Sequence, residues 1–517
     1  MTEPVPSPEA SPTGAALSPA EVTFDRRRRT LGLVLGPTSF LLVLALPLAE
    51  LQPPAHRLAA VLVWAVVWWV SEAVPIPVTA LLGPTLMVVL GIAPVKEAMV
   101  GFGDPVLFLF LGSFTLAAAM SRHGLDRRLA YRLLASRLAG SSATATIAAF
   151  AVLSTVLSMW ISNTATTAML CPIALGVLAA ISRLLEQATG KPVDAARLRF
   201  GAALLLASAY GASIGGVATP VGTPPNLIAL GQLATLAGVK IPFFHWMVIG
   251  LPIALAMLVV LIVVLRLALP PELGVIPGGT AFIAAELARL GRPGRGERNV
   301  MVAFALAVTL WVLPGIVALI AGTDSALCKG LSALLPESVV ALVAVVLLFV
   351  LPVDWAERRF TLSWAEAVQI DWGTLLLFGG GLSLGAAMFS TGLAHSLGNA
   401  LTSITGAHST LALTYVFTVT GILLTELTSN TAVTTMLVPL AIAAAQAAGV
   451  DPVAPGVGCA LGCSMAFMLP VATPPNAIVY GTGCVPITTM IRVGCWLVAA
   501  AALLIPPAVV LLVRLVS

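Results

Sequence analysis

Charged residues are scarce in this sequence. Only 9% of its 517 residues are Asp, Glu, Lys or Arg, against about 25% in an ordinary soluble domain. Histidine occurs five times, tyrosine four times, and the net charge is only +4. Nothing in such a chain resembles the dense basic surface of a nucleic-acid-binding protein, so no nucleic-acid partner is expected.

Catalytic and metal-binding patterns are also lacking. The six cysteines are scattered through apolar sequence, with no histidine or acidic partner near the Cys459 and Cys463 pair, so they are interpreted as buried, reduced thiols. No nucleophile, general base and orienting group converge in the pattern, and the sequence therefore predicts no enzyme.

Hydrophobic residues are abundant instead, at 59% of the chain. Runs such as "LPIALAMLVVLIVVLRLAL" are long enough for the ~20 helical residues that cross an apolar membrane core of ~30 Å. About 11 to 14 apolar segments of this kind recur after Leu31. The sequence therefore predicts an all-α polytopic membrane protein.

The N-terminal residues differ from the rest. Residues 1–30 are rich in Pro, Ser and Ala, offer no apolar period, and are predicted to form a disordered tail. Four arginines, Arg26 to Arg29, precede the first apolar run, and the positive-inside rule places this end in the cytoplasm. The expected location is a plasma membrane, and the wealth of Arg and Ala indicates a bacterial inner membrane.

The second half of the chain repeats the first. "LFLGSFTLAAAMSRHGL" at 109–125 aligns with "LFGGGLSLGAAMFSTGL" at 377–393, "SNT" follows at Ser162 and again at Ser429, and "TPPN" follows at Thr223 and again at Thr473. Three features in the same order indicate two membrane repeats. We place them at residues 31–269 and 299–517, with a cytoplasmic linker at 270–298 that contains a short amphipathic helix.

Charge gives the relative orientation of the two repeats. Around Gly124 the first copy carries five arginines, whereas its counterpart at 390–409 has no Lys or Arg. The positive-inside rule then places the two copies on opposite faces of the membrane. Inverted repeats that meet at the midplane are typical of secondary transporters. The five arginines are Arg122, Arg127, Arg128, Arg132 and Arg137.

The Ser-Asn-Thr patches are suited to ion binding. Asn163 and Asn430 each offer an amide oxygen and two N–H donors. A further hydroxyl lies four residues before each serine, Ser158 in one half and Thr425 in the other, which is the spacing of one helix face. Oxygen ligands of this kind suit a hard cation such as Na⁺.

The Pro-Pro pairs break the helices beside these patches. Pro224 and Pro474 cannot donate backbone hydrogen bonds, so carbonyls near Gly222 and Ala472 become free to face a cation. A helix that restarts after the prolines directs its N-terminal N–H groups at an anion. Unwound backbone at membrane depth is tolerated where it lines a cavity.

A fixed positive charge is missing from these segments. No Lys, Arg or His lies in 141–180, 201–239 or 411–491. A bound anion would therefore depend on bound cations for its charge balance, which couples ion binding to substrate binding.

These residues match a family. The paired "SNT" and "TPPN" motifs, with "WWVSEAVPIPVTALLGP" and "IDWGTLLLFGGGLSLGAAM", resemble the divalent anion/sodium symporters from about Leu31 to the end of the chain. The resemblance implies a homodimer in which each protomer has a scaffold domain and a moving transport domain with two re-entrant hairpins. It also implies an elevator motion.

The resemblance also implies the site residues. Sodium would be bound at Ser158, Ser162, Asn163 and Gly222 in one half, and at Thr425, Asn430 and Ala472 in the other. The substrate carboxylates would be bound by Ser162, Asn163, Thr164, Thr223, Pro224, Ser429, Asn430, Thr431, Thr473 and Pro474.

The leading hypothesis is therefore a sodium-coupled symporter of C4-dicarboxylates such as succinate, malate or fumarate, surrounded by membrane lipid. A sodium-independent dicarboxylate exchanger and a sodium-coupled citrate or sulfate transporter are the alternatives. The role of Glu426, a carboxylate inside an apolar run, is left open between a proton site and a structural partner.

Overall fold

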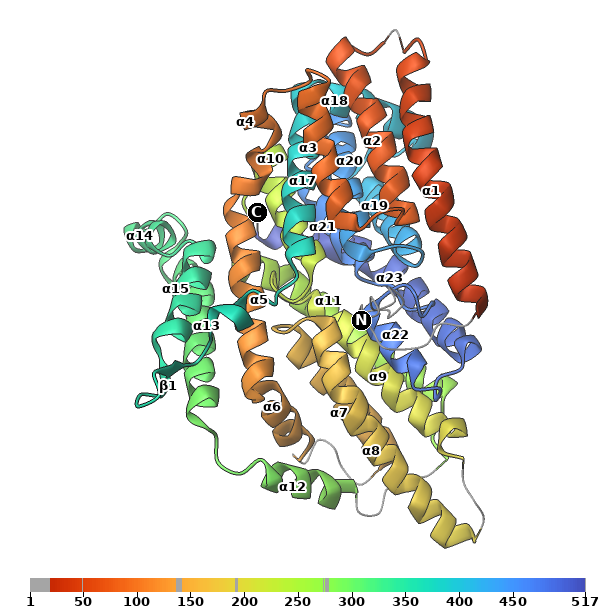
Figure 1. The fold of residues 1–517 in the computed structure, drawn as a ribbon, viewed down its shortest axis with the longest axis vertical. Coiled ribbons are helices and arrows are strands. Elements are labelled where there is room, and N and C mark those ends of the chain that lie inside the picture. Colours follow the sequence, from red (N-terminus) through yellow and green to blue (C-terminus); the bar gives the residue numbers. More distant parts are fainter. Residues whose placement is uncertain are drawn as a thin grey trace, which may run out of the picture.

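The computed structural model describes residues 19–48, 50–135, 142–190, 194–272, 274 and 279–516. Arg137 and residues 1–18 of the expected tail lie outside this part. Nearly all the described chain is helical (Figure 1).

The N-terminal tail is shorter than the sequence predicts. Helix α1 (Pro19–Ala45) already includes the arginine cluster, so the prediction of disorder is wrong for residues 19–30. Arg28 and Arg29 pair with Asp25 at 2.8 Å each, three and four residues away on the same helix, and Arg28 also reaches Glu72 at 3.2 Å. Such i,i+3 and i,i+4 ion pairs support a helix that lacks an apolar period.

Three N-terminal helices form one side of the molecule. Helix α1 packs along α2 (Pro53–Ser71), and α3 (Ile76–Val89) packs between α2 and α17 (Trp372–Ser390). The short α4 (Val95–Ala98) and the 3₁₀ helix η1 (Val100–Gly103) then lead into the first repeat.

Among the described residues, each predicted repeat includes a block of seven α-helices in the same order. The first consists of α5 (Pro105–His123), α6 (Leu125–Leu134), α7 (Ala143–Ser158), α8 (Asn163–Thr189), α9 (Arg199–Gly216), α10 (Pro224–Leu236) and α11 (Phe243–Ala268), with the 3₁₀ helix η3 (Ala195–Arg197) before α9. The second consists of α17, α18 (Leu393–Thr405), α19 (Thr410–Thr425), α20 (Asn430–Ala447), α21 (Val453–Cys463), α22 (Pro474–Gly481) and α23 (Ile487–Val516).

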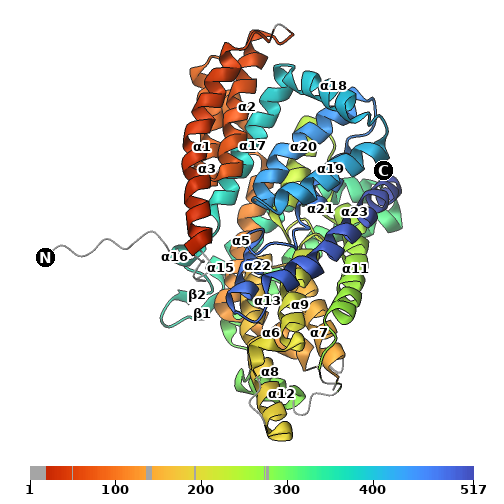
Figure 2. The same ribbon diagram turned by 90° about the vertical axis from the view of Figure 1, so that its right-hand side faces the viewer.

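The repeats are inverted, as the charge pattern predicts. In Figure 2, helices α7 and α8 approach the middle of the molecule from the bottom, whereas α19 and α20 approach it from the top. Helices α7 and α19 have 16 residues each and therefore rise only about 24 Å, which is less than a membrane core of ~30 Å. Both helices therefore end inside the membrane and turn back, as the predicted hairpins do.

Another group of elements lies between these two blocks, and from residue 299 onward it belongs to the predicted second repeat. Helix α12 (Gly279–Arg289) lies in the predicted linker, and a short antiparallel β-hairpin follows α15. The other elements of this group are α13 (Arg295–Ala321), α14 (Ala326–Leu334), α15 (Glu337–Val350), β1 (Pro352–Asp354), β2 (Arg359–Phe360) and α16 (Trp364–Ala367).

The described chain is a multi-pass membrane protein. It contains nine helices long and apolar enough to cross a membrane, or up to eleven if each of two bent helix pairs is one span. This is at the lower end of the count of apolar segments, because hairpin and broken helices such as α7, α19, α21 and α22 are too short to cross alone. Large apolar side chains remain exposed on the outer helices, among them Leu31, Leu267, Ile320 and Leu503, as a lipid-facing surface requires.

The two repeats interlock at the centre. Helix α22 of the second repeat packs against α8 and α9 of the first, and α10 of the first packs against α20 and α21 of the second. Long-range hydrogen bonds join them; for example, Gln232 Nε2 donates to the Thr435 carbonyl at 3.1 Å, and Tyr210 Oη donates to the Phe467 carbonyl at 2.6 Å. This exchange of helices brings the motif-bearing segments of both halves into one region.

Candidate functional site

All four motifs lie where helices begin. Asn163 and Asn430 are the first residues of α8 and α20, and Pro224 and Pro474 are the first residues of α10 and α22. Proline is favoured at this position because its missing N–H would have no partner there anyway. Four helix N-termini, with free N–H groups and a positive dipole end, therefore belong to the two hairpins and two breaks, and such ends favour anions.

The first candidate cation cradle forms around Gly216. Ser158 Oγ donates to Asn163 Oδ1 at 2.7 Å. A Cβ atom on Gly216 would lie 2.5 Å from Asn163 Oδ1 and 3.2 Å from the Thr223 Cβ, and a Cβ on Gly222 would lie 2.5 Å from the Gly216 carbonyl oxygen. The hairpin tip and the break at 217–223 therefore touch, as the sequence predicts for Ser158, Asn163, Gly222 and Thr223.

The second cradle repeats this arrangement. Thr425 Oγ1 donates to Asn430 Oδ1, as Ser158 does to Asn163. Thr425 also bonds to the Cys463 carbonyl at 2.8 Å, which ties the second hairpin to the end of α21. Ala472 is buried within the second break, residues 464–473.

The asparagine of each "TPPN" motif organises the break beside it. Asn226 Nδ2 donates to the carbonyls of Gly216 at 2.9 Å and Thr219 at 2.7 Å. Asn476 Nδ2 donates to the carbonyls of Ala466 at 3.2 Å and Leu469 at 3.0 Å. Both side chains therefore bind carbonyls ten and seven residues upstream. These hydrogen bonds stabilise the conformation of each unwound segment.

The same two asparagines each leave an oxygen free. Oδ1 of Asn226 and Oδ1 of Asn476 are buried, and neither has a hydrogen-bond partner among the described atoms. Buried polar atoms in native structures are almost always satisfied, so an orphaned pair at equivalent places indicates missing ligands. Neutral amide, hydroxyl and carbonyl oxygens are the donor set of a hard monovalent cation. The residues present therefore fit Na⁺.

Burial separates the predicted ligands into two groups. The side chains of Ser158 and Thr425 are fully buried, and Gly222 and Ala472 are buried beside them. Ser162, Thr164 and Pro474 are exposed, whereas Pro224, Asn163, Ser429, Asn430 and Thr431 are intermediate. Ser158 and Thr425 thus lie behind the surface on which a substrate would bind, with Gly222 and Ala472 beside them. Ser162, Asn163 and Asn430, which are predicted to bind both sodium and substrate, lie closer to that surface. Thr223 and Thr473 are buried at the boundary, at 4% and 5% exposure.

The structure does not bond the two cradles directly to one another. Among the described residues, no hydrogen bond joins Asn163 or Thr164 of the first hairpin to Asn430 or Thr431 of the second. Asn226 and Asn476 were not predicted as site residues, although both stand in the repeated "TPPN" motif. Glu426, whose role the sequence leaves open, is buried directly after Thr425 at the end of α19.

Gly216→Ala is expected to abolish transport. The rest of the fold is expected to keep most of its stability. The added methyl group would overlap Asn163 Oδ1 and displace the hairpin tip from the break. Gly330→Ala in α14 is the matched control, because a Cβ there meets nothing within 4 Å and alanine favours a helix. Uptake by both variants in reconstituted vesicles, beside their melting temperatures, tests this. Normal uptake by Gly216→Ala would contradict the cradle geometry.

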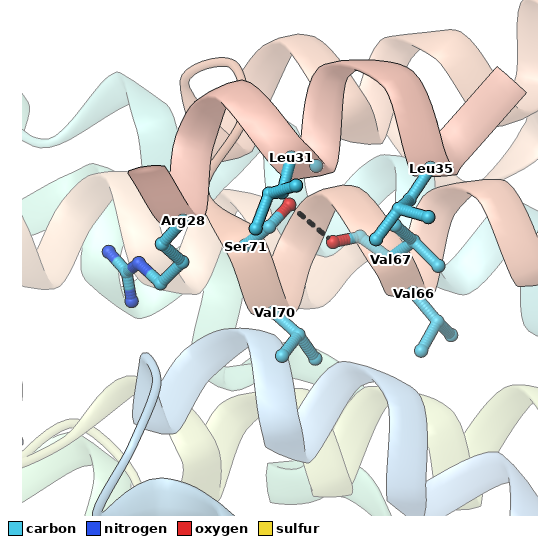
Figure 3. A pocket seen from close by; sticks show the side chains of 8 residues that line it. Arg28, Leu31, Leu35, Val66, Val67, Val70 and Ser71 are labelled. Carbon is cyan, nitrogen blue, oxygen red and sulfur yellow. Dashed lines mark hydrogen bonds between the residues drawn. The ribbon is translucent and has the colours of Figure 1, made fainter. Parts of the chain in front are cut away.

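An apolar groove of about 430 Å³ lies elsewhere, between α1 and α2 (Figure 3). In it Ser71 Oγ donates to the Val67 carbonyl at 2.6 Å, and Arg28 pairs with Asp25. No residue of the Ser-Asn-Thr or Thr-Pro-Pro-Asn motifs lines it, and it is not the candidate site. Its lining comprises Arg28, Leu31, Gly32, Leu35, Val66, Val67, Val70 and Ser71.

Comparisons with known proteins agree with the motifs. The sodium-dependent dicarboxylate transporter SdcS of Staphylococcus saprophyticus is 36% identical to this chain over 470 residues, which cover 90% of this chain and 88% of that protein. SdcS of Staphylococcus aureus strain USA300 is 35% identical over 481 residues, which cover 92% and 89%.

Solved structures share the fold at low identity. The MtrF protein of Neisseria gonorrhoeae, described as one of a class of antimetabolite efflux pumps, matches with a TM-score of 0.54 and 16% identity over 82% of this chain and 84% of that one. The YdaH transporter of Alcanivorax borkumensis matches with a TM-score of 0.50 and 16% identity over 81% and 86%. These likenesses concern the fold alone.

A family model described as the sodium:sulfate symporter transmembrane region matches residues 28–512. This match spans both repeats, both cradles and all four motifs. Together with relatives above 30% identity that are aligned along nearly their whole length, it shows that the chain belongs to the sodium:sulfate symporter family.

Proposed function

We propose that this protein is a Na⁺-coupled symporter of C4-dicarboxylates such as succinate, malate or fumarate. The observation that carries the proposal is the pair of equivalent oxygen cradles, each beside a buried amide oxygen that lacks a partner. The names of the SdcS relatives, as sodium-dependent dicarboxylate transporters, support the choice of ion and substrate class.

The ligand sets follow from burial. One Na⁺ would be held by Ser158, Asn163 and Gly222 with Ser162 at the rim, and the other by Thr425, Asn430 and Ala472. Asn226 and Asn476 would each add an Oδ1 ligand. Two bound Na⁺ then offset a dianion in segments that lack Lys, Arg and His, which lowers the cost of moving the loaded site through a low-dielectric region.

The substrate would bind between the hairpin tips. Its two carboxylates would accept hydrogen bonds from the amides and hydroxyls of Asn163 and Thr164 at one end and of Asn430 and Thr431 at the other. Each tip begins a helix, and a helix N-terminus stabilises an anion through its free N–H groups. Two such ends on opposite sides favour a ligand with two anionic groups.

The wider mechanism is proposed from the family resemblance. The hairpins, breaks and helices around them would move as a transport domain against a scaffold, in an elevator motion, within a homodimer surrounded by lipid. The arginines of α1, α6 and the linker favour a cytoplasmic N-terminus in a bacterial inner membrane. Because the description of the family model names sulfate, sulfate is the second candidate substrate.

The test is uptake of labelled succinate into proteoliposomes under an inward Na⁺ gradient, with K⁺ in its place as the control. Uptake is expected to require Na⁺ and to be suppressed by excess unlabelled malate or fumarate. Uptake that ignores Na⁺ but rises when succinate is preloaded inside would assign the protein to exchange. Na⁺-dependent uptake of labelled sulfate without succinate uptake would replace the substrate.

A further inference from the structure

The side chain of Glu426 binds the backbone of the second break. Its carboxylate is 2% exposed and lies in the tip of the second hairpin, directly after Thr425. Oε1 accepts from the N–H groups of Phe467 at 2.7 Å and Met468 at 3.0 Å, and Oε2 accepts from those of Met468 at 3.0 Å and Leu469 at 3.2 Å. Three consecutive N–H groups of an unwound segment, which no helix satisfies, therefore converge on one carboxylate.

The hydrogen bonds to Glu426 fix the direction in which the carbonyls of the second break point. In a trans peptide the C=O points opposite to the N–H, so the carbonyls of Ala466 and Phe467 face away from Glu426. On the far side, Asn476 Nδ2 donates to the Ala466 carbonyl, and the Tyr210 hydroxyl donates to the Phe467 carbonyl. Glu426 thus positions Asn476, whose buried Oδ1 is free for a cation.

The first half has no such carboxylate. Ser158 and Thr425 occupy equivalent places, so Met159 corresponds to Glu426. There the Met159 carbonyl accepts from the Thr219 hydroxyl, and the Val217 carbonyl accepts from the Trp246 indole at 3.1 Å. Neutral donors therefore hold the first break, whereas a carboxylate holds the second.

The Glu426 carboxylate also lacks a fixed counter-charge. None of the ion pairs found in the described part of the chain includes it, and 411–491 contains no Lys, Arg or His. An unpaired carboxylate in a water-poor interior favours a cation nearby. The cradle formed by Thr425, Asn430 and Ala472 is one residue away along the hairpin.

We propose that Glu426 is a positioning residue that makes the two cation cradles unequal, so that the second binds Na⁺ more tightly than the first and binds it without substrate. The inference rests on the proposed function and adds to it an order of binding: Na⁺ enters the second cradle first, and the first cradle fills afterwards.

The test is a Na⁺ titration of purified protein in detergent without substrate, followed through the melting temperature, because a ligand that binds only the folded state stabilises it. Glu426→Gln keeps the shape but removes the charge, and replaces one acceptor oxygen by an NH₂ group. The half-saturating Na⁺ concentration is expected to rise at least about tenfold. In vesicles the Na⁺ concentration that gives half-maximal uptake is expected to rise by a similar factor.

Two further variants separate charge from shape. Glu426→Asp keeps the charge, and its half-saturating Na⁺ concentration is expected within about threefold of wild type. Glu357→Gln is the control, because Glu357 is exposed between β1 and β2 and pairs with the exposed Arg359 at 2.9 Å. It should leave the titration unchanged.

The outcomes distinguish this inference from the proposed function. A wild-type protein that Na⁺ does not stabilise would overturn the proposed function itself. If wild type is stabilised and Glu426→Gln titrates like it, the inference is wrong while the function stands. Should Glu426→Gln fail to fold, Glu426→Asp decides: a tenfold weaker Na⁺ response in that variant overturns the role of the charge.

Discussion

Asn163→Ala is expected to lower Na⁺-driven succinate uptake about a hundredfold or more. The amide oxygen of Asn163 already accepts a hydrogen bond from Ser158 and faces the first cradle, while its N–H groups are available for a carboxylate. Each hydrogen bond or contact to a charged partner contributes roughly 1.5–3 kcal/mol, and the loss of two corresponds to about two to four decades in the transport rate constant. Uptake into proteoliposomes at saturating and limiting Na⁺ measures the effect.

The equivalent variant in the second half provides a comparison. Asn430→Ala removes the partner of Thr425 and is expected to be similarly inactive, and the double variant should show no Na⁺-dependent uptake. Asn399→Ala is the matched control, since Asn399 is exposed on α18 and its side chain bonds only to His395 among the described residues. Uptake by Asn163→Ala at the rate of Asn399→Ala would exclude Asn163 from the site.

Glu297→Ala is expected to lower the free energy of unfolding by about 3–5 kcal/mol. Glu297 is paired with Arg128, and the two side chains are 7% and 6% exposed. The guanidinium also donates to the carbonyls of Gly291 at 2.7 Å and Leu290 at 3.2 Å. Removal of the carboxylate would leave a buried, uncompensated charge, which costs far more than the pair contributes. Denaturant unfolding in detergent, followed by tryptophan fluorescence, is the measurement.

Glu286→Ala supplies the contrast. Glu286 pairs with Arg289 at 2.6 Å, but the arginine side chain is 76% exposed, and an exposed pair contributes about 0–1 kcal/mol. A simultaneous Arg128→Leu and Glu297→Leu change should recover much of the stability, because it removes both charges. Equal destabilisation by Glu286→Ala and Glu297→Ala would contradict the importance of burial. The buried pair fastens the end of the linker to α6, the helix that leads to the first hairpin.

Much of the site could be predicted because its chemistry is local. An Asn after a capping serine begins a helix, and a Pro-Pro pair ends one and starts the next, wherever the chain then goes. Pro224 and Pro474 therefore occupy the places expected of them. Each motif also occurs twice, so the second copy supports the interpretation of the first.

The expectation that Ser158 and Ser162 share one helix face is wrong, because α7 ends at Ser158 and α8 begins at Asn163. The same break separates Thr425 from Ser429.

The error at the N-terminus also has a local explanation. Residues 19–30 lack an apolar period, which is why disorder was predicted, but their helix is supported by the Asp25 pairs and by Glu72 on the next helix. Ion pairs of this kind leave no periodic hydrophobic signal. A pairing partner 44 residues away could not be identified from the local pattern.

The sequence alone determined the membrane class, the helical repeats, their opposite orientation and the oxygen-rich motifs, because hydropathy, charge bias and helix-start chemistry act over a few neighbouring residues. Only the tertiary structure decided that α22 packs on α8 and α10 on α20, that the Oδ1 atoms of Asn226 and Asn476 are left without partners, and that Glu426 binds the N–H groups of Phe467, Met468 and Leu469. These contacts join residues about 40 to 300 positions apart. Their geometry depends on how all the helices fill space together, and no local pattern records it.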